Sequence, residues 1–209
     1  MPTETVVDRL IKIHREERMR IDSSQMPLGS NNVKYNTWYY GRKVSGPQFM
    51  WCAVYQSWVN AKCGIPMSIY PMAASVPIVR DFFRAKGRIF NRPMPGDYVL
   101  FIFSATKRHI GFVDSVQDDG NFTSFEGNTS DRVKRVAHRV GDSGIVGFGR
   151  PEYDKIEEDD MTKDEYIDVL RSAFTPGFDR VADWAKQLNE VRQNVERIKQ
   201  DVEELKSRA

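Results

Sequence analysis

The spacing of hydrophobic positions divides residues 3–148 into a helical part followed by a strand-rich part. Apolar side chains recur at helical spacing over residues 3–20, 51–63 and 74–86, and the last two segments are each followed by a glycine. Apolar runs bounded by polar turns predict short strands over residues 98–103, 109–116, 121–126, 133–140 and 144–148. Because the helices come first and hairpin-type strands follow, the pattern predicts an α+β fold with an antiparallel sheet.

The C-terminal part of the chain has a different pattern. Residues 154–162 are rich in acidic side chains and predict a linker. From residue 181 to 205, hydrophobic residues alternate at three- and four-residue intervals, which is typical of a coiled coil; the alternative is a helix that folds back on the body. We therefore expect one domain over residues 1–153, the acidic linker, and a helical region over 163–209. Residues 181–205 would make the protein a homo-oligomer or dock it onto another partner.

Charge is unevenly distributed along the 209-residue chain, whose formal net charge is +2. Residues 1–155 hold 22 Lys and Arg against 15 Asp and Glu, a net of +7, and residues 156–209 hold 9 against 14, a net of −5. A basic body suits an anionic partner such as nucleic acid, lipid headgroups or a bacterial wall. The basic residues are scattered and form no recognition motif, so we expect no nucleic-acid partner. No apolar run approaches the roughly 20 residues of a membrane helix, so we expect no membrane insertion.

The two cysteines, Cys52 and Cys63, exclude a disulfide framework and a four-cysteine zinc site. On one helix they would lie roughly 16 Å apart, whereas a disulfide requires Cα atoms within about 7 Å. Cys52 falls in the first turn of the helix predicted over residues 51–63. Unpaired backbone N–H groups and the helix dipole favour a thiolate there, and a thiolate is a nucleophile. Cys63, near the other end, is interpreted as a core residue.

His109 begins a predicted strand and is a candidate base for thiolate chemistry; the alternative is a surface histidine after a basic pair. A hairpin loop of residues 117–120 or 119–120 would put Glu126 and Asn128 on the face of His109, because side chains alternate with period two. A three- or five-residue loop without a bulge would put them on the opposite face. A carboxylate and an amide beside an imidazole are typical of a catalytic triad.

Five segments of the chain together resemble the CHAP domain, the cysteine, histidine-dependent amidohydrolase/peptidase. In chain order they are WYYG, WCAVYQSWV, MPGDYVLF, RHIGFVDSV and FTSFEGNTS, and the likeness covers about residues 3–153. Within that family, the sequence resembles lysins of phages that infect actinobacteria and related Gram-positive hosts. The resemblance implies a papain-like fold and hydrolysis of a peptidoglycan amide, by an N-acetylmuramoyl-L-alanine amidase or an endopeptidase.

Carried over to this sequence, the resemblance implies Cys52 as the nucleophile and His109 as the base, with Glu126 and Asn128 as the E-x-N pair. Gln48 or the backbone N–H of Cys52 is then the expected oxyanion donor. Some family members bind calcium through aspartates before the cysteine, but this chain has no acidic residue from 23 to 80. We therefore expect no calcium, no other metal and no cofactor.

Two alternatives to a thiol hydrolase come from other classes. A metal-dependent hydrolase would use a set such as His109, Glu126 and His138, but H-E-x-x-H spacing is absent. His14 and His138 are instead interpreted as a helix residue and a surface residue. The second alternative is a non-catalytic virion or structural protein with a CHAP-like body and an oligomerising coiled coil.

The resemblance also carries expectations about where the protein works. The N-terminus lacks the basic start and apolar block of a secretory signal. A phage endolysin without such a signal would remain in the host cytoplasm until lysis and then act on the peptidoglycan of the bacterial cell wall. No recognisable wall-binding module follows the body, so we expect the helical region over 163–209 either to oligomerise the enzyme or to target it to the wall.

Overall fold

The computed structural model describes residues 4–156, and its architecture there is α+β, as the hydrophobic pattern predicts. The elements are α1 (Val6–Arg18), η1 (Ile21–Ser23), α2 (Lys34–Tyr40), α3 (Cys52–Lys62), α4 (Val76–Ala85), β1 (Ile89–Phe90), β2 (Tyr98–Ile102), β3 (Arg108–Val116), β4 (Asn121–Thr129), β5 (Arg132–Arg139), β6 (Ile145–Gly149) and η2 (Tyr153–Lys155). The predicted coiled coil and its oligomerisation lie outside the described residues. No helix in the described part is long and apolar enough to cross a membrane.

The three helices and five strands predicted between residues 3 and 148 are present, with small differences at their ends. The pattern did not predict α2 or β1. The two residues of β1 are too few to show a period, and α2 is a seven-residue helix whose apolar positions are mostly aromatic. Its end at Gly41, which has a φ of 65°, fits a left-handed C-cap.

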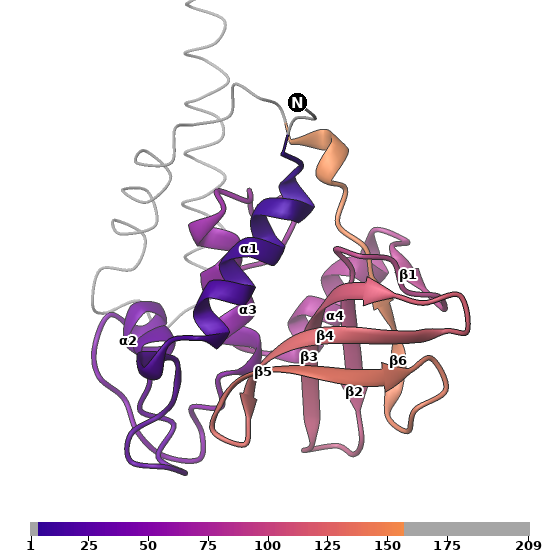
Figure 1. Ribbon diagram of the computed structural model, residues 1–209. Coiled ribbons are helices and arrows are strands. Elements are labelled where there is room, and N and C mark those ends of the chain that lie inside the picture. Colours follow the sequence, from indigo (N-terminus) through magenta and orange to yellow (C-terminus); the bar gives the residue numbers. More distant parts are fainter. Residues whose placement is uncertain (1–3, 157–209) are drawn as a thin grey trace, which may run out of the picture.

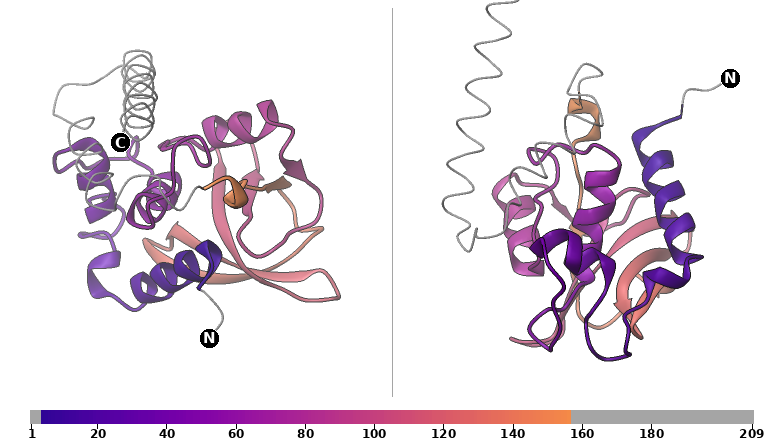
Figure 2. Two further views of the ribbon diagram at one scale, coloured as in Figure 1. Left: turned by 90° about the horizontal axis from the view of Figure 1, so that it is seen from above. Right: turned by 90° about the vertical axis from the view of Figure 1, so that its left-hand side faces the viewer.

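The six strands form one antiparallel sheet in the order β1-β6-β2-β3-β4-β5, with β6 inserted between β1 and β2 (Figure 1). Helix α3 packs against β3 and β4, α1 packs against α3 and β5, and α4 packs against β1, β3 and β6. Figure 2 shows these helices gathered on one side of the strands. The central strands are therefore covered by helices on that face.

Two hydrophobic clusters occupy the two faces of the sheet. The larger one lies between the helices and the sheet and includes Tyr98 and Leu100, whereas Val99 and Phe101 belong to the smaller one. The rings of Phe122 and Phe148 in the smaller cluster are only 5.4 Å apart. They come from β4 and β6, which are three strand spacings of about 4.8 Å apart in the sheet. The sheet must therefore curl around this smaller cluster.

The β3–β4 hairpin differs from both expected loop lengths. Its loop has three residues, 118–120. Alone, this loop would turn Glu126 to the face opposite His109. β3 compensates with a bulge at Asp114, where the register shifts by one residue. Beyond the bulge the register is that of a four-residue loop, and Glu126 lies on the face of His109.

Candidate active site

Cys52 is the first residue of α3 and is only 6% exposed. The residue before it, Trp51, is fully buried, stacks on Tyr35 at 5.5 Å and gives the helix no side-chain cap. The helix is tied to the sheet by Gln56, whose Nε2 donates to the carbonyl oxygen of Phe125 at 2.9 Å. These contacts fix the helix N-terminus, and with it the thiol, against the end of the sheet.

Close contact between α3 and β4 depends on Gly127. A Cβ at this position would lie 2.5 Å from Cβ of Tyr55, a distance that packed side chains do not tolerate. Gly111 on β3 has a similar role, since a Cβ there would meet Cγ of Glu126 at 2.9 Å. The missing side chain at Gly111 therefore leaves room for Glu126.

His109 lies between Cys52 and Glu126. Its Nε2 is 2.9 Å from Oε2 of Glu126, and its side chain is 19% exposed. Burial alone would lower the pKa of this imidazole. Hydrogen bonding and charge from Cys52 and Glu126 act in the opposite direction and together raise the pKa of His109 to about 10. Cys52 and Glu126 together therefore favour the protonated imidazolium of His109 at neutral pH.

Glu126 accepts hydrogen bonds on both carboxylate oxygens. Oε2 accepts from His109 and from Oγ1 of Thr129 at 2.9 Å, and Oε1 accepts from Oγ of Ser124 at 2.8 Å and lies 2.7 Å from Nε2 of His138. Burial raises the pKa of this carboxyl, which is 4% exposed, but the hydrogen bonds outweigh burial and hold its pKa well below the ordinary value. Glu126 is therefore ionised.

Asn128 does not join this hydrogen-bonded set. Its backbone has a φ of 61°, and its Nδ2 lies 3.4 Å from Oδ1 of Asn31 and 3.7 Å from Sδ of Met50. The left-handed backbone turns the amide toward the loops before α3. Thr129 takes the place beside the imidazole, with Oγ1 3.3 Å from Nε2 of His109. A period-two argument could not find this, because it assumes extended backbone at every residue.

Gln48, the alternative oxyanion donor, is exposed, and its side-chain amide lies against Gly46. The backbone N–H groups at the start of α3 are therefore better placed than Gln48 to receive negative charge next to Cys52. Cys63 is half-buried at the C-cap of the same helix, packed against the larger cluster, as expected for a core residue.

The interpretation of His138 as a surface residue is wrong. Its side chain is 13% exposed, and it contacts Glu126. β5 pairs with β4 so that His138 lies opposite Phe122, on the face of the sheet that also carries Glu126, and the two side chains meet there. His14 is a helix residue, as expected, but it is fully buried, with Nδ1 2.8 Å from the hydroxyl oxygen of Tyr55.

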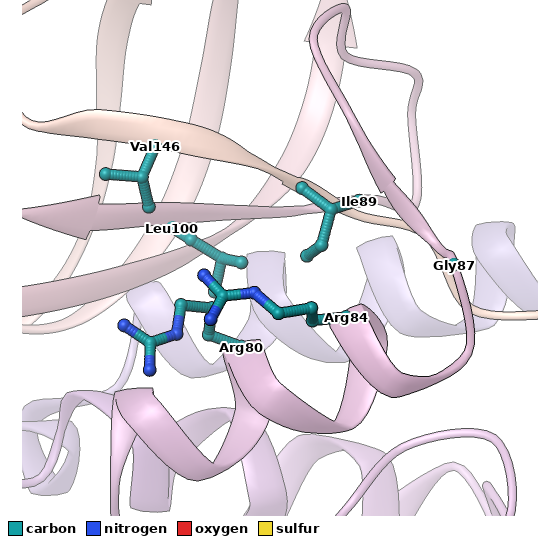
Figure 3. A pocket seen from close by; sticks show the side chains of 6 residues that line it. All are labelled: Arg80, Arg84, Gly87, Ile89, Leu100 and Val146. Carbon is teal, nitrogen blue, oxygen red and sulfur yellow. The ribbon is translucent and has the colours of Figure 1, made fainter.

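A cavity of about 170 Å³ lies elsewhere, between α4 and strands β1, β2 and β6 (Figure 3). Its lining residues are Arg80, Arg84, Gly87, Ile89, Leu100 and Val146, and none of them belongs to the Cys52–His109–Glu126 cluster. The chemistry-bearing side chains and this cavity are therefore separate features of the described structure.

Within residues 4–156, no group of three or more His, Cys, Asp and Glu side chains is arranged to hold a metal ion. Comparison of the chain with known protein families, with curated proteins and with solved structures gave no match. The assignment of a function therefore depends on the site itself and on the sequence resemblance.

Proposed function

We propose that this protein is a thiol hydrolase in which Cys52 is the nucleophile and His109 the general base and acid. The observation that carries the proposal is the position of His109, between the thiol at the start of α3 and the buried carboxylate of Glu126. A nucleophile, a base and a third group that orients the base form the general pattern of nucleophilic catalysis. We further propose that the helix-and-sheet arrangement is papain-like.

In the proposed reaction, the Cys52 thiolate attacks the carbonyl carbon of an amide, and the carbonyl oxygen becomes an oxyanion beside the N-terminus of α3. The imidazolium of His109 then gives its proton to the leaving amine as the C–N bond breaks, leaving a thioester. Neutral His109 next takes a proton from water as that water attacks the thioester. The C–S bond then breaks, the carboxylic acid product leaves, and the thiolate–imidazolium pair is restored.

Peptidoglycan is the substrate that the resemblance to CHAP lysins favours. The basic charge of residues 1–155 supports this proposal, because a net charge of +7 suits an anionic wall. In this function the protein is a phage endolysin, either an amidase or an endopeptidase. It degrades the cell wall and thereby lyses the host cell. Because Asn128 contacts Asn31 and Met50 and not His109, its role in this proposal is to bind substrate and not to hold the imidazole.

The test is digestion of purified Gram-positive cell walls by the wild-type protein and by Cys52→Ala, followed by mass spectrometry of the soluble fragments. The proposal expects fragments from the wild type alone. Free stem peptides identify an amidase, and cut cross-bridges identify an endopeptidase. Equal release by Cys52→Ala would contradict the mechanism. No release from walls of several chemotypes would favour the non-catalytic virion or structural protein.

A further inference from the structure

A second histidine contacts the carboxylate that orients His109. Nε2 of His138 on β5 lies 2.7 Å from Oε1 of Glu126, and Nε2 of His109 lies 2.9 Å from Oε2. The two oxygens of one buried carboxylate are thus each in contact with an imidazole. Neither the sequence pattern nor the E-x-N motif assigns a role to His138.

The ring of His138 is held by groups other than Glu126. It packs against the rings of Phe101 and Phe122, at centroid distances of 5.1 and 5.3 Å, within the smaller hydrophobic cluster. Its second nitrogen, Nδ1, lies 3.7 Å from Oδ2 of Asp142. Because these contacts fix the orientation of the ring, His138 can fix the orientation of Glu126.

The carboxylate needs such support because the last torsion of a glutamate side chain is soft. Ser124 and His138 contact Oε1, and this leaves Oε2 for Thr129 and His109. Without the contact at Oε1, the carboxylate could rotate or shift toward Ser124. Its hold on the imidazolium of His109 would then weaken.

We propose that His138 is a positioning residue, which keeps the Glu126 carboxylate aligned on His109 by a hydrogen bond to Oε1. The inference rests on the proposed thiol mechanism, since it concerns the alignment of the base in that mechanism. If His138 only packed in the smaller cluster, its aromatic ring would be sufficient, whereas the positioning role also needs the donor nitrogen Nε2. The two roles are therefore separable by substitution.

Three variants separate the effect of the aromatic ring of His138 from the effect of its donor nitrogen. H138F keeps an aromatic ring between Phe101 and Phe122 but removes the donor. H138Q and H138N both carry an amide, but only glutamine extends far enough to put its nitrogen near the position of Nε2. Each variant is made in the full chain in a C63S background, so that Cys52 is the sole thiol.

The measurement is the rate of Cys52 alkylation by iodoacetamide from about pH 4 to pH 9, an interval that reaches the ordinary range of a cysteine thiol. At the acid end of this interval, we expect the folded wild type to react faster than the same protein unfolded in urea, because an aligned imidazolium favours the thiolate. In H138F and H138N, we expect the rate there to fall about threefold. H138Q should restore most of it. Thermal unfolding followed by circular dichroism shows that each variant is folded, and if H138F is not, the H138Q and H138N pair decides.

The outcomes distinguish the two proposals. Wild-type alkylation that is fast at acid pH and unchanged in H138F and H138N would overturn the role of His138 and leave the thiol mechanism standing. A loss of rate in H138Q as large as that in H138N would also overturn the role of His138, because the donor would then not matter. Folded wild type that reacts no faster at acid pH than the unfolded protein would overturn the thiol mechanism, and the role of His138 with it.

Discussion

His109 and Glu126 face each other across β3 and β4, with Nε2 of the imidazole 2.9 Å from Oε2 of the carboxylate. The contact is possible because position 111, opposite the glutamate, is a glycine, and because the bulge at Asp114 corrects the register that the loop alone would give. A buried carboxylate at this place stabilises the imidazolium and fixes its orientation, which are separate contributions to the proposed chemistry.

We predict that E126Q lowers kcat for wall hydrolysis by about 100-fold with a much smaller change in KM. The amide is nearly isosteric, but it has no charge, and its orientation toward His109 is no longer fixed by ionic hydrogen bonds. Release of soluble fragments as a function of wall concentration gives both constants. D119N, a substitution in the exposed hairpin loop, is the control and should behave as wild type. A KM effect alone would contradict the orienting role.

The two cysteines should differ in reactivity toward a small alkylating agent. Cys52 lies at the helix N-terminus beside His109, whereas Cys63 lies at the other end of α3. At pH 6, we expect iodoacetamide to modify Cys52 at least tenfold faster than Cys63, because the imidazolium favours the thiolate there. Peptide mass spectrometry of a time course measures both rates. Equal rates in the folded protein would contradict a thiolate–imidazolium pair.

The hydrophobic pattern predicted the main elements between residues 3 and 148, and it put Glu126 beside His109 on the basis of loop lengths that the structure does not have. Alternation along β4 fixed which residues share a face with Glu126. The loop length and the bulge each shift the face, and their effects cancel. A bulge at Asp114 has no sequence signal here, so the correct position depended on a register that the sequence alone did not determine.

Three features of the site could not be predicted because they arise from tertiary structure. His138 reaches Glu126 through the pairing of β5 with β4, which no local pattern specifies. Asn128 turns away because its backbone is left-handed, and Thr129 thereby comes to the imidazole. The burial of His14 had a signal, since it lies at helical spacing from Leu10, but a polar residue on an apolar face does not reveal its partner.

Gly127 is predicted to be essential for the position of α3. G127A would place a methyl group 2.5 Å from Cβ of Tyr55, so the helix must move away from β4 or the variant must lose about 1–3 kcal/mol of unfolding free energy. Urea denaturation measures the loss, and Cys52 alkylation measures the displacement. Gly141, where an added Cβ meets no atom within 4 Å, is the matched control. If G127A and G141A have the same effect on both readings, the proposed packing requirement is wrong.

Removal of residues 157–209 is predicted to lower the oligomeric state, because the hydrophobic repeat over 181–205 is typical of a coiled coil. The truncation should follow Ile156, since this residue and Tyr153 pack against the larger hydrophobic cluster and Tyr153 donates to the carbonyl oxygen of Gly96 at 3.0 Å. Light scattering on both proteins gives the masses. If the full chain and the truncated chain form particles with the same number of chains, the proposed role of the repeat is wrong.

His14 provides a prediction about stability in mild acid. It is stacked between Phe112 and Phe125, at centroid distances of 4.6 and 5.2 Å, and burial lowers its pKa to about 3 from the ordinary 6.5. Because the folded pKa lies below the unfolded one, the unfolded chain binds the proton first. The contribution of neutral His14 to the free energy of unfolding is therefore complete above pH 6.5. It is lost as the pH falls toward 3, by up to about 1.4 kcal/mol per pH unit.

The interval from pH 6.5 to about 4.5 separates the contribution of His14 from those of Glu126 and His109. The pKa of Glu126 is lowered from 4.5, so its contribution is lost only below that value, and the raised pKa of His109 gives a contribution that is constant below 6.5. Urea denaturation at several pH values should therefore show a slope in the wild type that H14F lacks. H14F also leaves the Tyr55 hydroxyl unpaired, which costs about 1–3 kcal/mol at every pH. The change in slope, and not the absolute stability, is the decisive quantity, and an equal slope in both proteins would show that His14 is not the buried neutral group.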